Sequence, residues 1–464
     1  MRQNVIAAIS TPPGKGGVAI IRMSGDGALE IADKIFISVG GKRLSSYPPR
    51  MQVYGYIIYN EEKIDDGLLT YFPAGHSYTG EETVEISCHG GILITRTVLE
   101  CLFTNGAIPA EAGEFTSRAF INGRLTLTEA EAIGNLLEAR SMEQISLSSS
   151  PARQRLSGAI DEIRSELVST MSSIYARIDY PDEDLGEFTD DETVQRLKKT
   201  RHSLSRLIST YRTGRAINEG ISAVICGKPN VGKSTLYNAL LGEEAAIVTE
   251  IEGTTRDLLQ REISVGRVML RLTDTAGIRE SESADRVEKI GIERTKDAMR
   301  GAELLLVLFD TSRPLDEYDA LIMDELRNID MPKICILNKT DAATDAFDTS
   351  ALGECNFNEI IRISAKNDDG AAAELLGEII NKLFTDESIV TREDAIVSSA
   401  RQHSALCRCL SLIDTAISAY EAGLPADAAS SDVEMAIGAI SEVDGRSVSE
   451  AVVNDIFSKF CVGK

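Results

Sequence analysis

The chain has 464 residues, enough for two to four domains, and its hydrophobic content of 43% is ordinary for a soluble globular protein. Acidic residues outnumber basic ones by 72 to 48, giving a net charge of −24, which argues against a protein that coats nucleic acid by charge alone. RNA contact through one local patch or a basic partner stays open. The first ten residues lack the apolar core of a signal peptide, and the longest apolar run, 304–309, is too short to span a bilayer. We expect a cytosolic protein.

The cysteine and histidine pattern argues against a structural metal centre. The eight cysteines are scattered, without the spacing of a zinc site, and Cys407 and Cys409 lie two apart on an expected helix, so their side chains diverge. His89 follows Cys88 on an expected strand, where neighbouring side chains point to opposite faces. Cys461 differs from the others because it lies close to the C-terminus.

Residues 1–118 alternate short strands with turns rich in Gly and Pro. Runs of apolar and β-branched residues predict strands at 18–22, 53–59 and 83–87. We expect a separate α+β domain in this part of the chain.

Residues 119–215 show helical patterns. Thr128 and Glu131 form a capping-box pattern, and apolar residues then recur every three or four positions between 156 and 178. The acidic stretch 179–192 is expected to be a solvated loop.

The last segment, residues 385–464, also carries helical apolar faces, and such faces need a partner to bury them. The helices before residue 215 have the same need. The simplest arrangement is one all-α domain built from both segments, with residues 216–384 inserted between them.

The inserted segment contains two strings that together predict GTP binding. Residues 227–234 read G-x-x-x-x-G-K-S between an expected strand and an expected helix, which is the context of a phosphate-binding loop. Residues 338–341 read N-K-x-D, and the Asp341 carboxylate can accept hydrogen bonds from the ring N–H and exocyclic amine of guanine. We expect a Ras-like P-loop domain with a mostly parallel sheet.

Roles within this domain follow from the two strings. Backbone N–H groups of residues 230–233 would surround the phosphates, with Lys233 reaching the β and γ oxygens and Ser234 on Mg²⁺. Thr235 is expected to start the helix whose N-terminus favours the anion. Further expected contacts lie after later strands: Thr254, Thr255 as a second Mg²⁺ hydroxyl, Asp274 through water, Gly277, Asn338, Lys339, Asp341, Ser364, Ala365 and Lys366.

One position is informative because of the residue it lacks. Ras-like proteins use a glutamine after D-T-A-G to orient the attacking water, and this chain has Ile278 there. Another group must orient the water, in cis or from a partner. Arg256 and Arg279 are candidates for charge stabilisation, although either can equally be a solvated surface charge.

Several strings resemble the tRNA-modifying GTPase family written MnmE or TrmE, over essentially the full length. These strings are TPPGKGG at 11–17, GEFTSRAF at 113–120, LTLTEAEAI at 125–133, the Pro-Asn form of the phosphate loop, GTTRD at 253–257 and the tail FCVGK at 460–464. Small departures from the family pattern are Arg124 for a common lysine, Val462 for Ile or Leu, and Lys15 for Arg.

The resemblance implies a folate-binding N-terminal domain that also forms a homodimer, and a flavoprotein partner, MnmG (GidA). Together the two proteins would add a carboxymethylaminomethyl or aminomethyl group to carbon 5 of the wobble uridine in tRNA. A 5-formyl-type tetrahydrofolate would carry the one-carbon unit.

The resemblance also implies roles for particular residues. Arg22, Glu85, Arg124 and Lys464 would line the folate site, Cys461 would be needed for modification, and Glu288 would orient water. K⁺ at the interface of two facing GTPase domains would be bound by Asn230, Thr249, Ile251 and Thr254. The expected nucleotide-binding residues also include the remaining members of the loop 249–254 and of the strings already quoted. They are Val231, Gly232, Thr249, Glu250, Ile251, Glu252, Gly253, Thr275 and Ala276.

Taken singly, these residues also have ordinary explanations. Arg22 and Glu85 can be charges at strand ends, Cys461 a terminal thiol, and Glu288 an acid on a helix surface. Two other functions share part of the pattern. A ribosome-assembly GTPase of the Era or EngA kind would leave the N-terminal region and the cysteine tail unexplained, and a one-carbon transferase with a GTPase module would need no flavoprotein.

Overall fold

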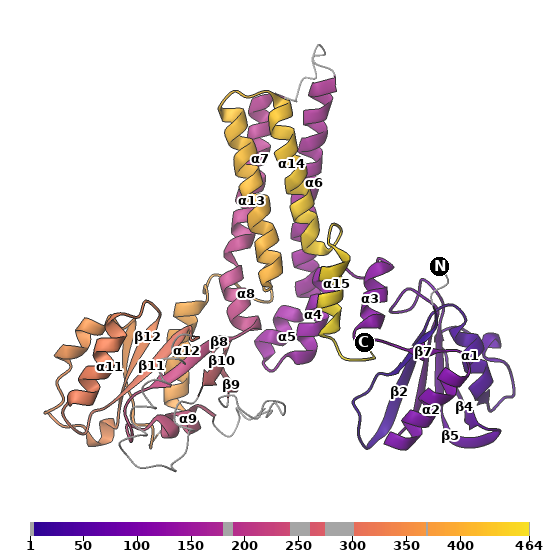
Figure 1. Ribbon diagram of the computed structural model, residues 1–464, viewed down its shortest axis with the longest axis horizontal. Helices are drawn as coiled ribbons and strands as arrows, with labels where there is room; N and C mark the ends of the chain where they lie inside the picture. Colours follow the sequence, from indigo (N-terminus) through magenta and orange to yellow (C-terminus); the bar gives the residue numbers. More distant parts are fainter. Residues whose placement is uncertain (1–3, 180–188, 242–259, 274–300, 368–369, 464) are drawn as a thin grey trace. The chain divides into compact units, whose positions relative to one another are not determined.

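The computed structural model describes residues 4–179, 189–241, 260–273, 301–367 and 370–463. The chain forms two compact units (Figure 1). The N-terminal unit comprises Met1–Gly134 and Gly438–Lys464, and the central unit is Asn135–Ile437. The two ends of the sequence therefore belong to the same unit.

A seven-stranded sheet, ordered β3-β4-β5-β6-β2-β1-β7, dominates the N-terminal unit. Its neighbours pair antiparallel except β1 and β7. Its strands are β1 (Ile6–Ile9), β2 (Gly16–Ser24), β3 (Phe36–Ser38), β4 (Gln52–Tyr59), β5 (Glu62–Phe72), β6 (Thr83–Gly90) and β7 (Ile108–Pro109). Helices α1 (Ala28–Ile35) and α2 (Ile92–Thr104) pack against the sheet and each other, burying a core that includes Ile21, Ile86 and Leu102.

The same unit contains α3 (Glu114–Ile121), α4 (Leu127–Glu138) and α15 (Glu450–Ser458), of which α3 and α15 pack together. The capping box of α4 does not start at the predicted residue. Thr126 accepts from the backbone N–H of Glu129, and the Glu129 carboxylate accepts from the N–H of Thr126. The Thr128 hydroxyl instead donates to the carbonyl of Val443, so the predicted pattern lies two residues too late.

Helices form one part of the central unit. They are α5 (Met142–Ser148), α6 (Ser150–Asp179), α7 (Asp190–Ser209), α8 (Tyr211–Asn218) and α13 (Ala400–Glu421), followed by α14 (Ala426–Asp444), which continues into the N-terminal unit. Helix α7 packs against both α6 and α13 (Figure 1). Helices from before and after the nucleotide-binding segment therefore bury each other's apolar faces.

A six-stranded sheet, ordered β13-β12-β11-β8-β10-β9, forms the other part of the central unit. All neighbours are parallel except β9 and β10. The strands are β8 (Ile221–Cys226), β9 (Gln260–Val265), β10 (Val268–Thr273), β11 (Leu304–Asp310), β12 (Lys333–Asn338) and β13 (Glu359–Arg362), and the helices are α9 (Lys233–Leu241), α11 (Glu317–Arg327) and α12 (Ala371–Phe384).

Both faces of this sheet are buried, as its continuous apolar strands require. One core contains residues of α9, α12 and β8 together with Leu147 of α5 and Ile217 of α8, and the other contains residues of α11 and β11. The mixed α+β, all-α and α/β fold class expected from the sequence is confirmed. Within the described ranges, none of the helices combines the length and hydropathy needed to cross a bilayer.

Candidate functional site

The phosphate-binding loop lies where the parallel strand β8 ends and α9 begins, the usual ligand edge of an open α/β sheet. Helix α9 starts at Lys233, two residues before the predicted Thr235, so Ser234 lies exposed in its first turn. The Lys233 ammonium donates to the carbonyls of Gly227 and Lys228, at 2.8 and 2.9 Å. The lysine thus stabilises the curved loop from inside.

Asn338, at the end of β12, joins this loop to the segment after β13. Its buried amide nitrogen donates to the Val231 carbonyl at 2.8 Å, and its amide oxygen accepts from the N–H of Ala365 at 2.9 Å. Gly232 has φ +102°, and a Cβ there would lie 2.2 Å from the Asn338 amide nitrogen. Only glycine fits this close approach.

Lys339 stabilises the same loop from the outside. Its ammonium donates to the Asn230 carbonyl at 2.8 Å and to the Asp310 carboxylate at 2.7 Å. Burial raises the pKa of Asp310, but hydrogen bonds from Lys339 and Ser312 outweigh burial and hold this pKa below its usual value. Asp310 therefore stays ionised and holds Lys339 in place.

Asp341 and Ser364 lie together, because the Ser364 hydroxyl donates to the Asp341 carboxylate at 2.6 Å. Both side chains are accessible to solvent. The hydrogen bond orients a carboxylate whose remaining lone pairs are available to a ligand. The structure therefore brings the N-K-x-D and S-A-K strings to one edge of the sheet, as the sequence predicts.

Lys228 is a supporting residue that the sequence analysis missed. Its buried ammonium lies 2.6 Å from Asp316 and 2.5 Å from Asp319, at the N-terminus of α11. This ion triad attaches the phosphate loop to a neighbouring helix. The loop motif accepts any residue at this position, so no signal in the sequence distinguishes Lys228 from a solvated lysine.

Part of the expected nucleotide site lies outside the described residues. It comprises Thr249, Glu250, Ile251, Glu252, Gly253, Thr254, Thr255, Arg256, Asp274, Thr275, Ala276, Gly277, Arg279 and Glu288. The described part contains the loop 230–235, the N-K-x-D string and residues 364–366.

In the N-terminal unit, Arg22 and Glu85 face each other across β2 and β6. The Arg22 Nε donates to Glu85 at 2.9 Å, and both side chains are largely buried. The guanidinium also lies 5.8 Å from the ring centre of Tyr78 and 5.7 Å from that of Phe115. A partly buried ion pair beside aromatic rings is a polar site with apolar walls, unlike a solvated strand end.

Arg124 lies against the same loop that carries Tyr78. A Cβ on Gly80 would lie 3.1 Å from the Arg124 Cγ. Arg22 and Arg124 thus both lie against this loop, although no hydrogen bond joins Arg124 to the Arg22–Glu85 pair among the described residues. Lys464 lies outside the described residues.

The C-terminal tail is attached to the N-terminal unit by backbone contacts. Val462 pairs antiparallel with Ala112, and the Ser10 hydroxyl donates to the Gly463 carbonyl at 3.0 Å. Ser10 follows β1, the strand that pairs with β2 at Arg22. The tail is therefore held beside the strands that carry the ion pair.

This attachment leaves one cysteine exposed. Cys461 is exposed, whereas Cys407 is half-buried and the other six cysteines are buried. Burial raises the pKa of Cys88 to about 11 and those of Cys226, Cys335 and Cys409 to about 12. Among the eight cysteines, Cys461 is therefore the thiol most accessible to a reagent or substrate.

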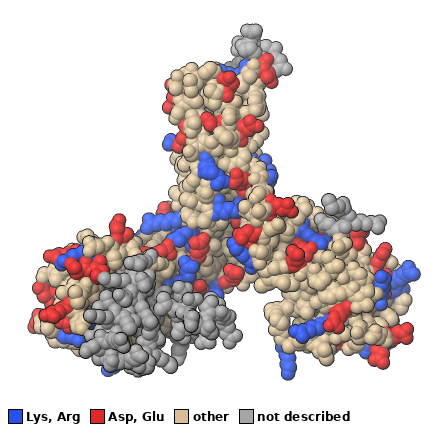
Figure 2. Space-filling model, viewed as in Figure 1, with Lys and Arg blue, Asp and Glu red and all other residues tan. Residues whose placement is uncertain are grey.

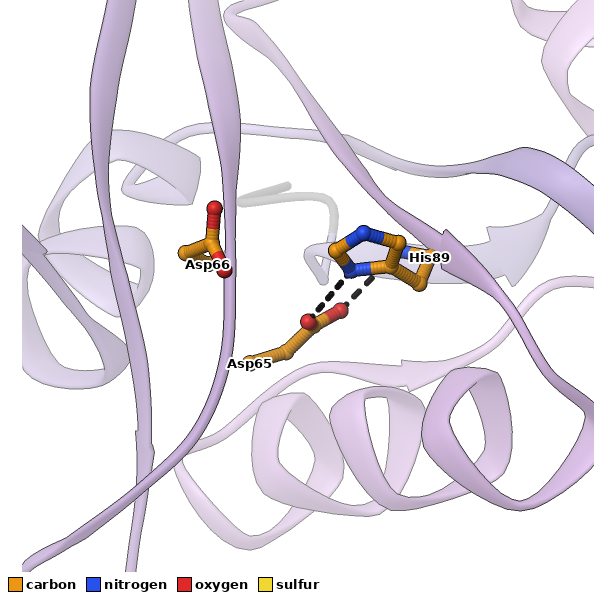
Figure 3. A group of neighbouring side chains, drawn as sticks. All are labelled: Asp65, Asp66 and His89. Carbon is orange, nitrogen blue, oxygen red and sulfur yellow. Dashed lines mark hydrogen bonds and ion pairs between the residues drawn. The ribbon is translucent and has the colours of Figure 1, made fainter.

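Asp65, Asp66 and His89 form the group shown in Figure 3. The Asp65 carboxylate accepts from the His89 backbone N–H at 2.9 Å and lies 2.6 Å from its ring Nδ1, and Asp66 accepts from the Tyr54 hydroxyl at 2.9 Å. Each carboxylate is already paired with a protein donor. His89 is exposed while Cys88 is buried, as the expected alternation along the strand requires.

The sheet, the phosphate loop and the N-K-x-D edge define the class of protein as a P-loop GTPase of the Ras-like kind. Two family models identify the family: "GTP-binding protein TrmE N-terminus" matches residues 5–124, and "MnmE helical domain" matches residues 127–461. The chain belongs to the MnmE (TrmE) family of GTPases.

Relatives match over the full length of the chain. Proteins named "tRNA modification GTPase MnmE" from Clostridioides difficile (strain 630) and Thermotoga maritima are 37% and 38% identical over 461 and 462 residues, and both comparisons cover 99% of this chain. The matched region is 99% of the Clostridioides difficile protein and 100% of the Thermotoga maritima protein. A relative of the same name from Lysinibacillus sphaericus is 38% identical over 467 residues, covering all of both chains.

Solved structures resemble a smaller share of the chain. Era of Aquifex aeolicus bound to GDP·AlF4− is 25% identical, covers 41% of this chain and 66% of that chain, and has a TM-score of 0.27. Era in complex with MgGDPNP and 16S ribosomal RNA is 26% identical with the same coverage and TM-score.

Proposed function

We propose that this chain is the GTP-hydrolysing subunit of a complex that modifies carbon 5 of the wobble uridine in tRNA. The observation that carries the proposal is the full-length match to relatives named tRNA modification GTPase. Two features support it: the N-K-x-D edge in the central unit, where Asp341 and Ser364 lie together, and an exposed cysteine on the tail that is attached next to β1 of the N-terminal unit. The tRNA substrate implies that the activity is cytoplasmic.

In the proposed nucleotide site, Asp341 reads the guanine edge, and residues 364–366 lie beside it, attached to Asn338 by the Ala365 N–H. When GTP binds, the Lys233 ammonium would leave the carbonyls of Gly227 and Lys228 and donate to phosphate oxygens instead. Mg²⁺ would be held by Ser234, whose hydroxyl oxygen suits this ion, and by Thr255. Bound Mg²⁺ supplies positive charge to the phosphate oxygens, and the loop's N–H groups orient them.

Hydrolysis is proposed to use Glu288 to orient water, since Ile278 cannot. Asn230 and the loop 249–254 would bind K⁺, which supplies positive charge at an interface between two GTPase domains. The Asn230 backbone has φ +62°, and its side chain makes no hydrogen bond to any residue in the described ranges. Its amide oxygen is therefore free to bind a cation.

A substitution tests the role of Glu288. Glu288→Ala should abolish GTP hydrolysis while GTP still binds, because a carboxylate that orients water does not hold the nucleotide. Phosphate release and fluorescent-nucleotide binding measure the two properties separately. Normal hydrolysis in this variant would remove Glu288 from the mechanism.

Tetrahydrofolate is the proposed one-carbon carrier, held near Arg22, Glu85, Arg124 and Lys464. The chemistry of the donors supports this choice. A carboxylate such as Glu85 can accept from the ring and exocyclic N–H groups of a pterin, and Tyr78 and Phe115 provide apolar walls. Arginine is suited to bind the carboxylates of the folate tail.

The wider assembly is also a proposal. A folate-binding domain, 1–118, would form a homodimer, and residues 119–215 with 385–464 would carry the GTPase domain 216–384. The flavoprotein MnmG (GidA) would supply the redox chemistry. Helix α7 packing on α13 supports a helical domain built from both sides of the insertion.

The test is a mass-spectrometric nucleoside analysis of bulk tRNA from cells with and without this gene. Deletion should remove the carboxymethylaminomethyl-type uridines, and the wild-type gene should restore them. An unchanged uridine profile on deletion would overturn the tRNA role while leaving the GTPase intact, and would favour a ribosome-assembly function.

A further inference from the structure

A segment of the central unit has a charge opposite to that of the whole chain. Between residues 193 and 218 there is no Asp or Glu, although acids outnumber bases by 72 to 48 overall. On the face of the molecule in Figure 2, acidic and basic side chains are interspersed, so an acid-free stretch is an exception. Its seven basic residues are Arg196, Lys198, Lys199, Arg201, Arg206, Arg212 and Arg215.

Most of these bases are neutralised by neighbouring helices or strands. Lys198 pairs with Glu421 at 2.7 Å and Arg201 with Asp414 at 2.5 Å, both on α13. Arg196 lies 3.8 Å from Glu166 of α6, and Arg215 pairs with Glu303. These ion pairs join α7 and α8 to their surroundings.

Arg212, on α8, donates to the Leu383 carbonyl. Lys199 and Arg206, on α7, are different. Both are exposed, and neither forms an ion pair with any residue that the structure describes. They lie seven residues apart on α7, which is two turns or about 10 Å along one helix face. His202, also exposed, lies between them on that face. We call Lys199, His202 and Arg206 the basic face of α7.

We propose that the basic face of α7 contacts the phosphate backbone of tRNA. This inference rests on the proposed function, which supplies the RNA. Exposed Lys and Arg side chains that have no ion-pair partner attract a polyanion and release its counterions on binding. Such a local surface offers a strongly acidic chain one way to approach RNA.

The composition of the face favours RNA over an acidic protein. The core of a protein–protein interface is enriched in aromatic and other large apolar side chains, whereas nucleic-acid interfaces are polar and positively charged. No large hydrophobic side chain of α7, which is described from end to end, is exposed. The face has the cations for phosphate contact without the apolar anchors of a protein interface.

The experiment compares tRNA binding by the full chain and by the double variant Lys199→Ala/Arg206→Ala. Fluorescence anisotropy with a labelled tRNA transcript is measured from about 50 to about 200 mM salt. We expect the double variant to bind about tenfold more weakly, and the slope of log affinity against log salt to fall by about 2, one for each phosphate contact. GTP hydrolysis and the melting temperature should not change.

The matched control is Lys42→Ala/Arg43→Ala, which removes one lysine and one arginine from exposed positions in the N-terminal unit. Its affinity and salt slope should equal those of the wild type. Equal losses in both double variants would mean that net charge alone matters and would overturn the proposal. Unchanged affinity and slope in the α7 variant would overturn it as well.

Complementation separates this inference from the proposed function. If deletion of the gene leaves the tRNA uridines unchanged, the proposed function fails whatever α7 binds. If deletion removes them and the α7 variant restores them with wild-type tRNA affinity, only the present inference fails. A variant that binds tRNA normally but does not restore the uridines would assign the face to a protein partner and overturn RNA contact.

Discussion

In the proposed nucleotide site, guanine specificity depends on the Asp341 carboxylate. In Asp341→Asn an N–H₂ donor replaces one of the two acceptor oxygens, so the side chain can no longer pair one oxygen with each of the two guanine N–H donors. We expect GTP affinity to fall roughly 10- to 100-fold, the equivalent of about 1.5–3 kcal/mol for hydrogen bonds to a charged group. Competition against a labelled GTP analogue measures the change.

Ser364→Ala is the matched control for Asp341. It removes the hydroxyl that orients the carboxylate at 2.6 Å and keeps the negative charge. Its GTP affinity should fall less than that of Asp341→Asn. Equal GTP affinity in Asp341→Asn and the wild type would show that guanine is read elsewhere.

Of the four histidines, one should have a pKa above the ordinary histidine value and another a pKa below it. The hydrogen bond to Asp65 raises the pKa of His89 above 6.5, whereas burial lowers the pKa of His403. In Asp65→Asn the His89 pKa should fall towards 6.5 and that of His403 should stay. NMR titration of the imidazole C–H signals measures both, and an unmoved His89 would contradict the pairing.

The sign of the accompanying stability effect follows from the raised pKa. A group that binds its proton more tightly in the folded state stabilises that state at low pH. The contribution of His89 is therefore complete below pH 6.5 and is lost as pH rises through its folded-state pKa. The difference in unfolding free energy between wild type and Asp65→Asn should shrink over that interval.

At the residue scale, motifs identify the residues that form the proposed nucleotide site better than those that support the base of its phosphate loop. Asn338 and Asp341 follow from the N-K-x-D string because their chemistry dictates residue type. Lys228 and its buried carboxylate partners do not, because many packing arrangements can fix the base of the loop. Their pairing spans about ninety residues, and no local pattern records it.

At the scale of elements, the strands of the nucleotide domain are the best predicted part. Runs such as β11, buried along all seven residues, are continuous and apolar because both faces of the sheet are covered. The start of α4 was misplaced because two threonines, Thr126 and Thr128, precede acids with the capping-box spacing. Which threonine caps depends on where the helix packs, and the sequence pattern does not contain that information.

The attachment of the tail should depend on Gly463. This residue has φ +97°, and a Cβ would lie 2.4 Å from the Ile9 carbonyl oxygen. Gly463→Ala therefore combines an unfavourable backbone conformation with a backbone clash, costing more than about 1 kcal/mol at this site. We expect the tail to detach, and a fluorophore on Cys461 to show lower anisotropy than in the wild type.

Gly423→Ala controls for backbone strain alone. Gly423 has φ +72° with open space where a Cβ would lie, and it belongs to the central unit. Its substitution should leave the anisotropy of the Cys461 label unchanged. Wild-type anisotropy in Gly463→Ala would mean that the tail is not held through Ile9 and Ser10.

At the scale of the whole molecule, the two candidate sites lie in different units. The phosphate loop and guanine edge lie in Asn135–Ile437, whereas Arg22, Glu85 and Cys461 lie in the unit made from both ends of the sequence. That unit depends on contacts such as Ser10 with Gly463, 453 residues apart. Neither hydrophobic periodicity nor a local motif predicts a contact between the two ends of the chain. Only the resemblance to a family indicated that the tail belongs with the N-terminal region.

This separation predicts that Cys461→Ser stops tRNA modification but leaves GTP hydrolysis unchanged. Serine is close to cysteine in size but carries a hydroxyl group in place of the thiol. Chemistry that needs a thiolate should therefore stop. The substitution lies outside the unit that contains the phosphate loop, so GTP hydrolysis should proceed at the wild-type rate. Nucleoside analysis of tRNA from complemented cells measures the first property, and phosphate release from the purified variant measures the second.

The paired outcomes decide the role of the thiol. Loss of the modified uridines with normal hydrolysis would place Cys461 in the modification step. Normal uridines in the variant would reduce Cys461 to an exposed terminal thiol. Loss of both activities would mean that the tail acts on the GTPase, and the Gly463→Ala variant, which keeps the thiol but releases the tail, would then lose hydrolysis too.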